Sequence, residues 1–232
     1  MNSPYGFAIG STLPLSRKGF FLPKIMRTYI YIDGFNLYYG AVKSTPFRWL
    51  DLMSLSRILL QPHHQIRRIK YFTARVSGTS TDRSKPDRQD AYLRALKAHI
   101  PEIEIYYGHF LQNLKTVWLS PPIAGHQSAT AIRTEEKGSD VNLAVHLLND
   151  AWKNEYDCAV LVSNDSDLAE ALRIVKSELK KMIGLVTPTR FRVSSELRQY
   201  ATFAKQIRQT ALAASQLPDP IPNTKIYKPP AW

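Results

Sequence analysis

The chain has 232 residues, 44% of them hydrophobic, which is enough for one packed domain with tails and too little for two comfortable domains. Its 31 lysines and arginines against 19 aspartates and glutamates give a formal net charge of +12, which favours a polyanionic partner because basic contacts to phosphates release counterions. The alternative is a basic surface without a specific partner. The single cysteine, Cys158, excludes an intramolecular disulfide and suits a reducing, cytoplasmic setting, and without CxxC or HExxH motifs we expect no zinc site.

The first 25 residues contain proline, glycine and serine, with three basic residues and no acid. Arg17 and Lys18 interrupt the apolar run that a secretory signal needs, and no later stretch is apolar over the length that spans a membrane. We interpret residues 1–25 as a flexible extension, or as an upstream mis-start before Met26.

The first predicted strand is TYIYID, residues 28–33, and it is followed by a predicted turn at Gly34. Asn36 comes three residues after Asp33, and a predicted helix begins at the next residue, Leu37. Both polar side chains follow the end of a strand, where ligands bind in open α/β sheets. Capping of the helix is the alternative role for each of them.

Strands and helices then alternate, which indicates crossover units and a parallel sheet. We predict helices over 50–60 and 87–99 and strands over 66–74 and 103–107. A loop over 76–86 is rich in glycine, serine and threonine and has the composition of a solvated linker or of a phosphate-contacting loop. The expected RNA contacts are basic residues in or near this loop and in a second loop after residue 188: Arg75, Arg83, Lys85, Arg88, Arg190 and Arg192.

The helical rhythm breaks over residues 108–134, which predicts a hairpin inserted at the edge of the sheet. Trp118 and Tyr107 in this region either stack on bases or pack the hairpin. A helix opens after Gly138, with an expected buried stripe that includes Val141, Val145 and Trp152.

Asp140 lies beside that stripe in the first turn, so we expect it to face inward, with Lys137 nearby. Complementation of the helix dipole is the alternative role for this acid.

The stretch CAVLVSNDSDLAEAL, residues 158–172, holds the strongest local signal. Its apolar first half is typical of a strand buried on both faces, and its second half has helical spacing. Asp165 and Asp167 therefore lie between a strand's carboxyl end and a helix's amino end. Capping accounts for one of the two acids and leaves the second unexplained.

After this stretch we predict a strand over 182–187, a last helix over 194–212 and a proline-rich tail over 213–232 that is extended or docks a partner protein. One α/β domain over 26–212 results, with a mostly parallel sheet of about five strands and the hairpin at its edge.

Four acids from three regions, Asp33, Asp140, Asp165 and Asp167, are expected to converge. Two carboxylates at a separation of ~5 Å repel each other by about 3 kcal/mol at an effective dielectric of ~20, so such a cluster calls for bound cations. Hard oxygen ligands select Mg²⁺ or Mn²⁺.

Three motifs, DGFNLYYG at 33–40, EEKGSDVNLA at 135–144 and LVSNDSDLAEAL at 161–172, resemble the NYN family, the LabA-like branch of the PIN-like nuclease superfamily. The resemblance covers residues 27–187 and implies a Rossmann-like three-layer sandwich with metal-dependent ribonuclease activity. It makes Asp33, Asp140 and Asp165 the metal-binding acids and Asp167 a further ligand or a water-positioning acid. It also implies support of the first acid by Asn36, orientation of the site by Ser163 or Asn164, and stabilisation of phosphate charge by Lys137.

The main hypothesis is therefore a ribonuclease that uses Mg²⁺ or Mn²⁺. A binding module that holds RNA or a protein without turnover is the alternative, because a fold alone does not give a reaction. A phosphatase is disfavoured, since no second acid follows Asp33 at two residues' distance. RNA is the expected partner and a membrane is not, while a homodimer and a protein bound to the tail are further options.

Overall fold

The chain forms one seven-stranded sheet in the order β4-β3-β2-β1-β5-β6-β7. The structure, a computed structural model, describes residues 24–188, 193–230 and 232. The strands are β1 (Met26–Asp33), β2 (His64–Ala74), β3 (Ile103–Ile123), β4 (His126–Lys137), β5 (Cys158–Val162), β6 (Met182–Thr187) and β7 (Phe203–Gln206). All neighbouring pairs are parallel except β3 and β4. The predicted mostly parallel α/β sheet is confirmed, with more strands than the expected five.

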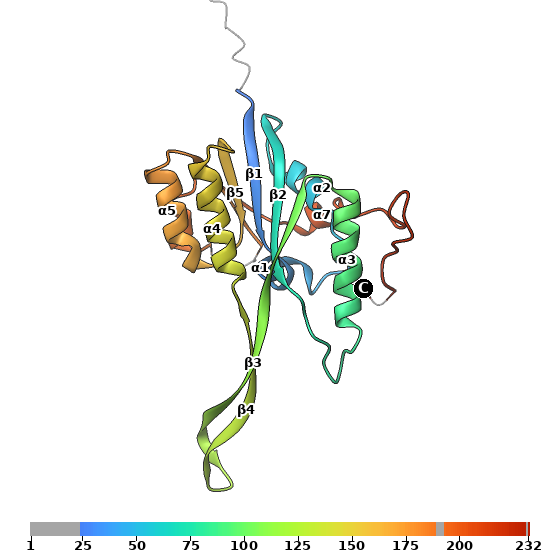
Figure 1. Cartoon of the computed structure of the whole chain (residues 1–232), viewed down its shortest axis with the longest axis vertical. Helices are drawn as coiled ribbons and strands as arrows, with labels where there is room; N and C mark the ends of the chain where they lie inside the picture. Colours follow the sequence, from blue (N-terminus) through green and yellow to red (C-terminus); the bar gives the residue numbers. More distant parts are fainter. Residues whose placement is uncertain (1–23, 189–192, 231) are drawn as a thin grey trace, which may run out of the picture.

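Helices cover both faces of this sheet, which gives the three layers seen in Figure 1. One face carries α4 (Ser139–Trp152), α5 (Ala169–Ser177) and α6 (Ser195–Arg198), and the other carries α2 (Leu52–Leu59), α3 (Lys85–His99) and α7 (Gln209–Ala213). The short α1 (Gly34–Leu37) runs into a π-helical turn, Tyr38–Val42, and a 3₁₀ turn, Ser166–Leu168, precedes α5. None of the helices in the described ranges has the length and apolarity to cross a bilayer.

The strands supply two hydrophobic cores because side chains alternate between the faces of a sheet. In β1, Ile30 and Ile32 belong to the core under α2 and α3, and Tyr31 belongs to the core under α4 and α5. All five residues of β5 are buried, as its apolar sequence predicts.

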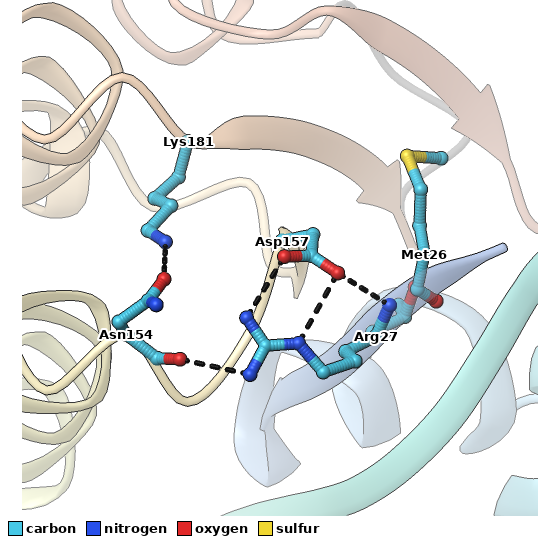
Figure 2. Close-up of polar contacts among 6 residues, drawn as sticks. Met26, Arg27, Asn154, Asp157 and Lys181 are labelled. Carbon is cyan, nitrogen blue, oxygen red and sulfur yellow. Dashed lines mark hydrogen bonds and ion pairs between the residues drawn. The ribbon is translucent and has the colours of Figure 1, made fainter. Parts of the chain in front are cut away.

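Polar contacts join the amino ends of three parallel strands (Figure 2). The Arg27 guanidinium, at the start of β1, donates to both carboxylate oxygens of Asp157, just before β5, at 2.9 and 3.2 Å. Arg27 also donates to the carbonyl of Asn154, whose side-chain oxygen accepts a hydrogen bond from Lys181, the residue before β6. The Arg27 contact lowers the pKa of Asp157. These contacts hold the strand starts together at the edge opposite the strand ends where ligands are expected.

A buried ion pair holds α4 against the sheet. Lys70 Nζ of β2 lies 2.7 Å from Asp150 Oδ2 of α4, with the two side chains only 8% and 7% exposed. The Tyr31 hydroxyl of β1 donates to the same carboxylate oxygen at 2.7 Å. Asp150 therefore ties the carboxyl-terminal part of α4 to β1 and β2.

The predicted edge hairpin is present and is long. β3 first pairs with β2 up to Gly108 and then pairs with β4 from His109 to Ile123, so one strand belongs to the sheet and to the hairpin. The two arms extend away from the body of the molecule (Figure 1). Trp118 is 79% exposed on this hairpin, so it does not pack the hairpin against the domain.

The predicted helix over 194–212 is wrong. The segment forms α6, the parallel strand β7 and α7 instead. Its buried apolar residues serve opposite faces of the sheet, Leu197 in one core and Ile207 and Leu212 in the other, and a single helix cannot reach both. Phe203 of β7 packs on Gly184 of β6, where any larger side chain would collide with its ring.

The proline-rich tail is packed rather than extended in its described part. Leu217 and Ile221 are buried, and the Trp49 indole donates a hydrogen bond to the Pro218 carbonyl at 3.1 Å. Trp232 makes edge contacts with Trp49 and Tyr92. Composition predicts an unpacked tail because few of its residues are apolar, yet Leu217, Ile221 and Trp232 all pack against the domain.

Candidate active site

The site lies where β1 and β5 end, next to each other at the centre of the sheet. The two strands are parallel with Ile32 opposite Val162, so Asp33 and Ser163 leave the sheet side by side. From β1 the chain crosses over to β2 on one side, and β5 lies on the other side. Ligands of open α/β sheets bind at such a point of reversal in strand order.

Asp33 is only 5% exposed and is held from two sides. Its Oδ1 accepts a hydrogen bond from the Asn36 backbone at 2.9 Å, and its Oδ2 accepts one from Ser163 Oγ at 3.1 Å. Burial raises the pKa of Asp33 against the effect of these hydrogen bonds, and the charge of Asp165 raises it further. Asp33 therefore does cap α1, and one of its oxygens also faces the end of the neighbouring strand.

The turn after β5 is organised by its own side chains. Ser163 Oγ accepts from the Asp165 backbone at 3.1 Å, and Asp165 Oδ1 accepts from the Asp167 backbone at 3.1 Å. The Asn164 backbone donates to Asn36 Oδ1 at 3.1 Å, which ties this turn to the loop after β1. Asp165 is half-buried and Asp167 is exposed, so Asp167 is the acid most accessible to solvent.

Asn36 and Asn164 connect the loop after β1, the turn after β5 and the start of α6. Asn36 contacts Asp33 through its backbone and Asn164 through its side chain. Asn164 in turn accepts a hydrogen bond from the Ser194 backbone at 2.9 Å, which links the site to the start of α6. The supporting and orienting roles predicted for these residues agree with these contacts and stay predictions.

Asp140 comes to the same place from the first turn of α4. The pKa of Asp140 is raised to about 6. Burial is the largest cause, and the negative charges of Asp33, Asp165, Glu136 and Asp167 add to it. All four predicted acids thus act on one another electrostatically. The predicted buried stripe of α4, from which we expected Asp140 to face inward, is wrong in part. Val141, Val145 and Trp152 are exposed, and α4 buries Leu143, Leu147 and Asp150 instead.

Two residues of the site escaped the sequence analysis. Glu136 accepts hydrogen bonds from the backbone and the hydroxyl of Ser139 at 3.2 and 2.7 Å. Its charge also acts on Asp140, so it is a fifth acid beside the four that were predicted. Glu136 lies in the EEKGSDVNLA motif, and this position is the sequence feature that could have identified it as a site residue. Tyr71 of β2 lies against Gly34, where an added Cβ would come within 2.7 Å of its ring and hydroxyl. No pattern in the sequence marks it.

The donor set fits a hard divalent cation, since it consists of carboxylate oxygens. Burial first, and then the repulsion between these carboxylates, raises the pKa of Asp33 and Asp140, and a bound cation would relieve that repulsion. The side chains do not converge into a preformed cage: among the described residues, no three acidic, histidine or cysteine side chains are close enough together to hold one ion.

The basic residues predicted to contact RNA or phosphate differ in whether they already form ion pairs. Lys137 pairs with Glu135 at 3.2 Å at the base of the hairpin, and Arg75 pairs with Asp90 at 2.7 Å and lies over the Tyr107 ring. Arg88 pairs with Asp82. Arg83 and Lys85 form no ion pair with another residue that the structure describes, while Arg190 and Arg192 lie outside the described residues.

This chain is similar to a named protein in sequence and to a solved structure in fold. The chain is 35% identical over 235 residues to a protein of Pseudomonas putida (strain DSM 28022 / S16) named 6-hydroxy-3-succinoylpyridine 3-monooxygenase HspA, a match that covers 89% of this chain and 75% of that protein. Among solved structures it resembles VPA0982 of Vibrio parahaemolyticus RIMD 2210633, a protein of unknown function, with a TM-score of 0.52 and 17% identity over 80% of this chain and 95% of that one. The second likeness shows the fold alone.

A family model described as NYN domain matches residues 27–206, from the start of β1 to the end of β7. The match spans the strand ends that carry the acids and extends beyond the three motifs quoted above. The chain belongs to the NYN domain family.

Proposed function

We propose that this protein is a divalent-metal-dependent ribonuclease. The observation that supports it best is the cluster of acids that lies at the end of β1, after β5 and at the start of α4. Burial, and then the charges of Asp33, Asp165, Glu136 and Asp167, raise the pKa of Asp140 in this cluster. Membership of the NYN family supports a PIN-like nuclease fold. The formal net charge of +12 supports a polyanionic substrate.

In this proposal Asp33, Asp140 and Asp165 hold Mg²⁺ or Mn²⁺. A bound cation of this kind lowers the pKa of a water molecule and neutralises charge on a phosphodiester. Ser163 holds the Asp33 carboxylate from the adjacent strand end. Asp167, the exposed acid, orients the attacking water and takes up its proton.

RNA is the proposed substrate, and the surface around the site supplies cations for it. Arg83 in the loop before α3 and Lys85 at the start of α3 form no ion pair within the described chain, so they can contact phosphates without breaking one. Lys137 lies at the hairpin base beside the α4 terminus and contributes positive charge from the other side. A second copy of the chain and a protein docked on the tail stay proposals.

The test is incubation of the purified chain with labelled single-stranded RNA in Mg²⁺, in Mn²⁺ and in EDTA. We expect cleavage that needs the metal and that Asp165→Asn abolishes, while Asp87→Asn in the first turn of α3 cleaves like the wild type. Tight RNA binding without cleavage in either metal would replace the proposal by a binding module.

A second candidate, hydroxylation of a pyridine ring, is favoured by the 35% identity to a protein named as a monooxygenase. A monooxygenase consumes dioxygen and two electrons from a donor. Incubation with 6-hydroxy-3-succinoylpyridine, air and a nicotinamide or flavin donor tests it: product formation that stops without dioxygen supports this candidate, and no turnover with any donor excludes it.

A further inference from the structure

A small cavity opens next to the acidic site, on the side of β2. Gly34, which directly follows Asp33, forms part of its wall, and the rest is largely aromatic, with Phe35, Tyr38, Tyr71 and Trp232. Its volume is about 80 Å³. A closed apolar cavity that takes up benzene measures roughly 150 Å³, so this cavity, which opens to solvent, admits only part of one flat ring. Aromatic walls of this kind favour a flat, polarisable ligand.

The polar group that points to a ligand is the Tyr71 hydroxyl. Tyr71 is 7% exposed, and its hydroxyl makes no hydrogen bond to any described residue. Its oxygen is not among the fully enclosed atoms without a partner in the described chain, which are Arg48 Nε and Ser215 Oγ, so it is open to the cavity. It lies over Gly34, where an added Cβ would be 2.7 Å from it.

Two basic side chains also line the cavity. Lys85 and Arg88, both in the first turn of α3, line it. Arg88 is held by Asp82 and by the Ser84 hydroxyl. Lys85 forms no ion pair with another residue of the described ranges, so its ammonium group is available to an anion.

We propose that this cavity binds the ring of an aromatic anion beside Asp33, with a polar ring atom on the Tyr71 hydroxyl and the anionic group on Lys85. Two sources share this chemistry. One is a pyrimidine nucleotide, whose single-ring base enters the cavity and whose phosphate meets Lys85; this source rests on the proposed ribonuclease function. The other is a free heteroaromatic carboxylate, which needs no nuclease activity.

The experiment is a calorimetric titration of the full chain in EDTA, so that no metal at the acids contributes. Uridine 5′-monophosphate and nicotinate represent the two sources, and uridine and nicotinamide are their uncharged counterparts. We expect one anion to bind, Tyr71→Phe to weaken it about five- to tenfold, and Tyr227→Phe, at an exposed tyrosine, to leave it unchanged. Lys85→Gln should weaken the anion and not its uncharged counterpart, while Lys97→Gln on the same helix should have no effect.

The inference is overturned if neither anion binds the wild type, or if Tyr71→Phe and Lys85→Gln both bind as the wild type does. Binding of the nucleotide alone assigns the cavity to RNA, and binding of nicotinate alone assigns it to a small molecule. RNA cleavage by the wild type separates this proposal from the ribonuclease: a wild type that binds the ring and cleaves no RNA keeps the cavity and rejects the nuclease. A wild type that cleaves RNA and binds neither anion keeps the nuclease and rejects the cavity. Asp165→Asn, which should cleave no RNA, should bind the ring as the wild type does.

Discussion

Ser163 Oγ donates a hydrogen bond to Asp33 Oδ2 at 3.1 Å and accepts one from the Asp165 backbone at 3.1 Å. One fully buried hydroxyl therefore fixes the first acid, on β1, relative to the turn that carries the second acid, after β5. The spacing of the two carboxylates depends on a side chain that holds no charge itself.

Ser163→Ala should lower RNA cleavage by on the order of 10- to 100-fold, as the loss of groups that orient metal ligands does, and should lower the free energy of unfolding by about 1 to 2 kcal/mol. Ser54→Ala is the matched control, because Ser54 also donates to an aspartate, Asp51, at the start of α2 and far along the chain from the site. The control should lose stability and keep its cleavage rate. Equal rates for both variants would show that Ser163 does not position the acids.

The thermal stability of the apoprotein should depend on Asp140. Its pKa is raised to about 6, chiefly by burial, so its neutral form stabilises the native state fully below about pH 4, and this contribution is lost as the pH rises through 6. Asp140→Asn removes the charge and should raise the melting temperature at pH 8 by ~2–4 °C, for about 1 kcal/mol after allowance for solvent screening. At pH 4 the two proteins should melt together.

The control for that measurement is Asp87→Asn, in the first turn of α3 and exposed. It should show no gain in melting temperature at pH 8. A gain at pH 8 in this variant as large as in Asp140→Asn would attribute the effect to the net charge of the protein rather than to the acid cluster.

Mg²⁺ or Mn²⁺ should stabilise the wild type, because a cation that binds only the native state shifts the unfolding equilibrium. At about 100 times its dissociation constant the gain is about 2.7 kcal/mol, or ~5–10 °C in melting temperature for a chain of this length. The gain should be mostly lost in Asp165→Asn. Melting curves that do not move with either metal would mean that the four acids hold no cation with useful affinity.

Asp150→Asn should destabilise the protein by about 3 kcal/mol, because it leaves the buried Lys70 ammonium without its carboxylate. Asp90→Asn, which breaks an exposed contact with Arg75, should cost less than ~1 kcal/mol. Urea unfolding of both variants makes the comparison. A smaller loss for Asp150→Asn than for Asp90→Asn would show that the pair does not hold α4 in place.

Sequence reasoning found the acids because each lies at the boundary of a recognisable element. Asp33 ends an apolar strand, Asp165 lies in the turn after another, and Asp140 opens a helix. The ends of parallel strands lie at one edge of a sheet, so the first two acids were expected there. Their membership of one electrostatic cluster required the strand order, which places β5 beside β1. The LabA-like branch and the residue roles stay predictions.

What sequence reasoning missed depends on contacts between distant residues. Tyr71 lies in an ordinary strand, and only its packing on Gly34 places it at the site. The segment after residue 194 has helix-compatible spacing, yet pairing of β7 with β6 overrides it. The tail packs because Trp49 and Tyr92 offer a surface to Trp232 across the chain, which local composition cannot indicate.

The most direct test of the account is the single-turnover rate of RNA cleavage in saturating Mn²⁺ by the wild type, Asp165→Asn and Asp87→Asn, each shown by its melting curve to be folded. We predict a rate for Asp165→Asn at least ~100-fold below that of the wild type, as for loss of a group that stabilises charge in the transition state, and an unchanged rate for Asp87→Asn. A rate for Asp165→Asn within about twofold of the wild type, or no cleavage by the wild type at all, would contradict the assignment of these acids to a nuclease centre.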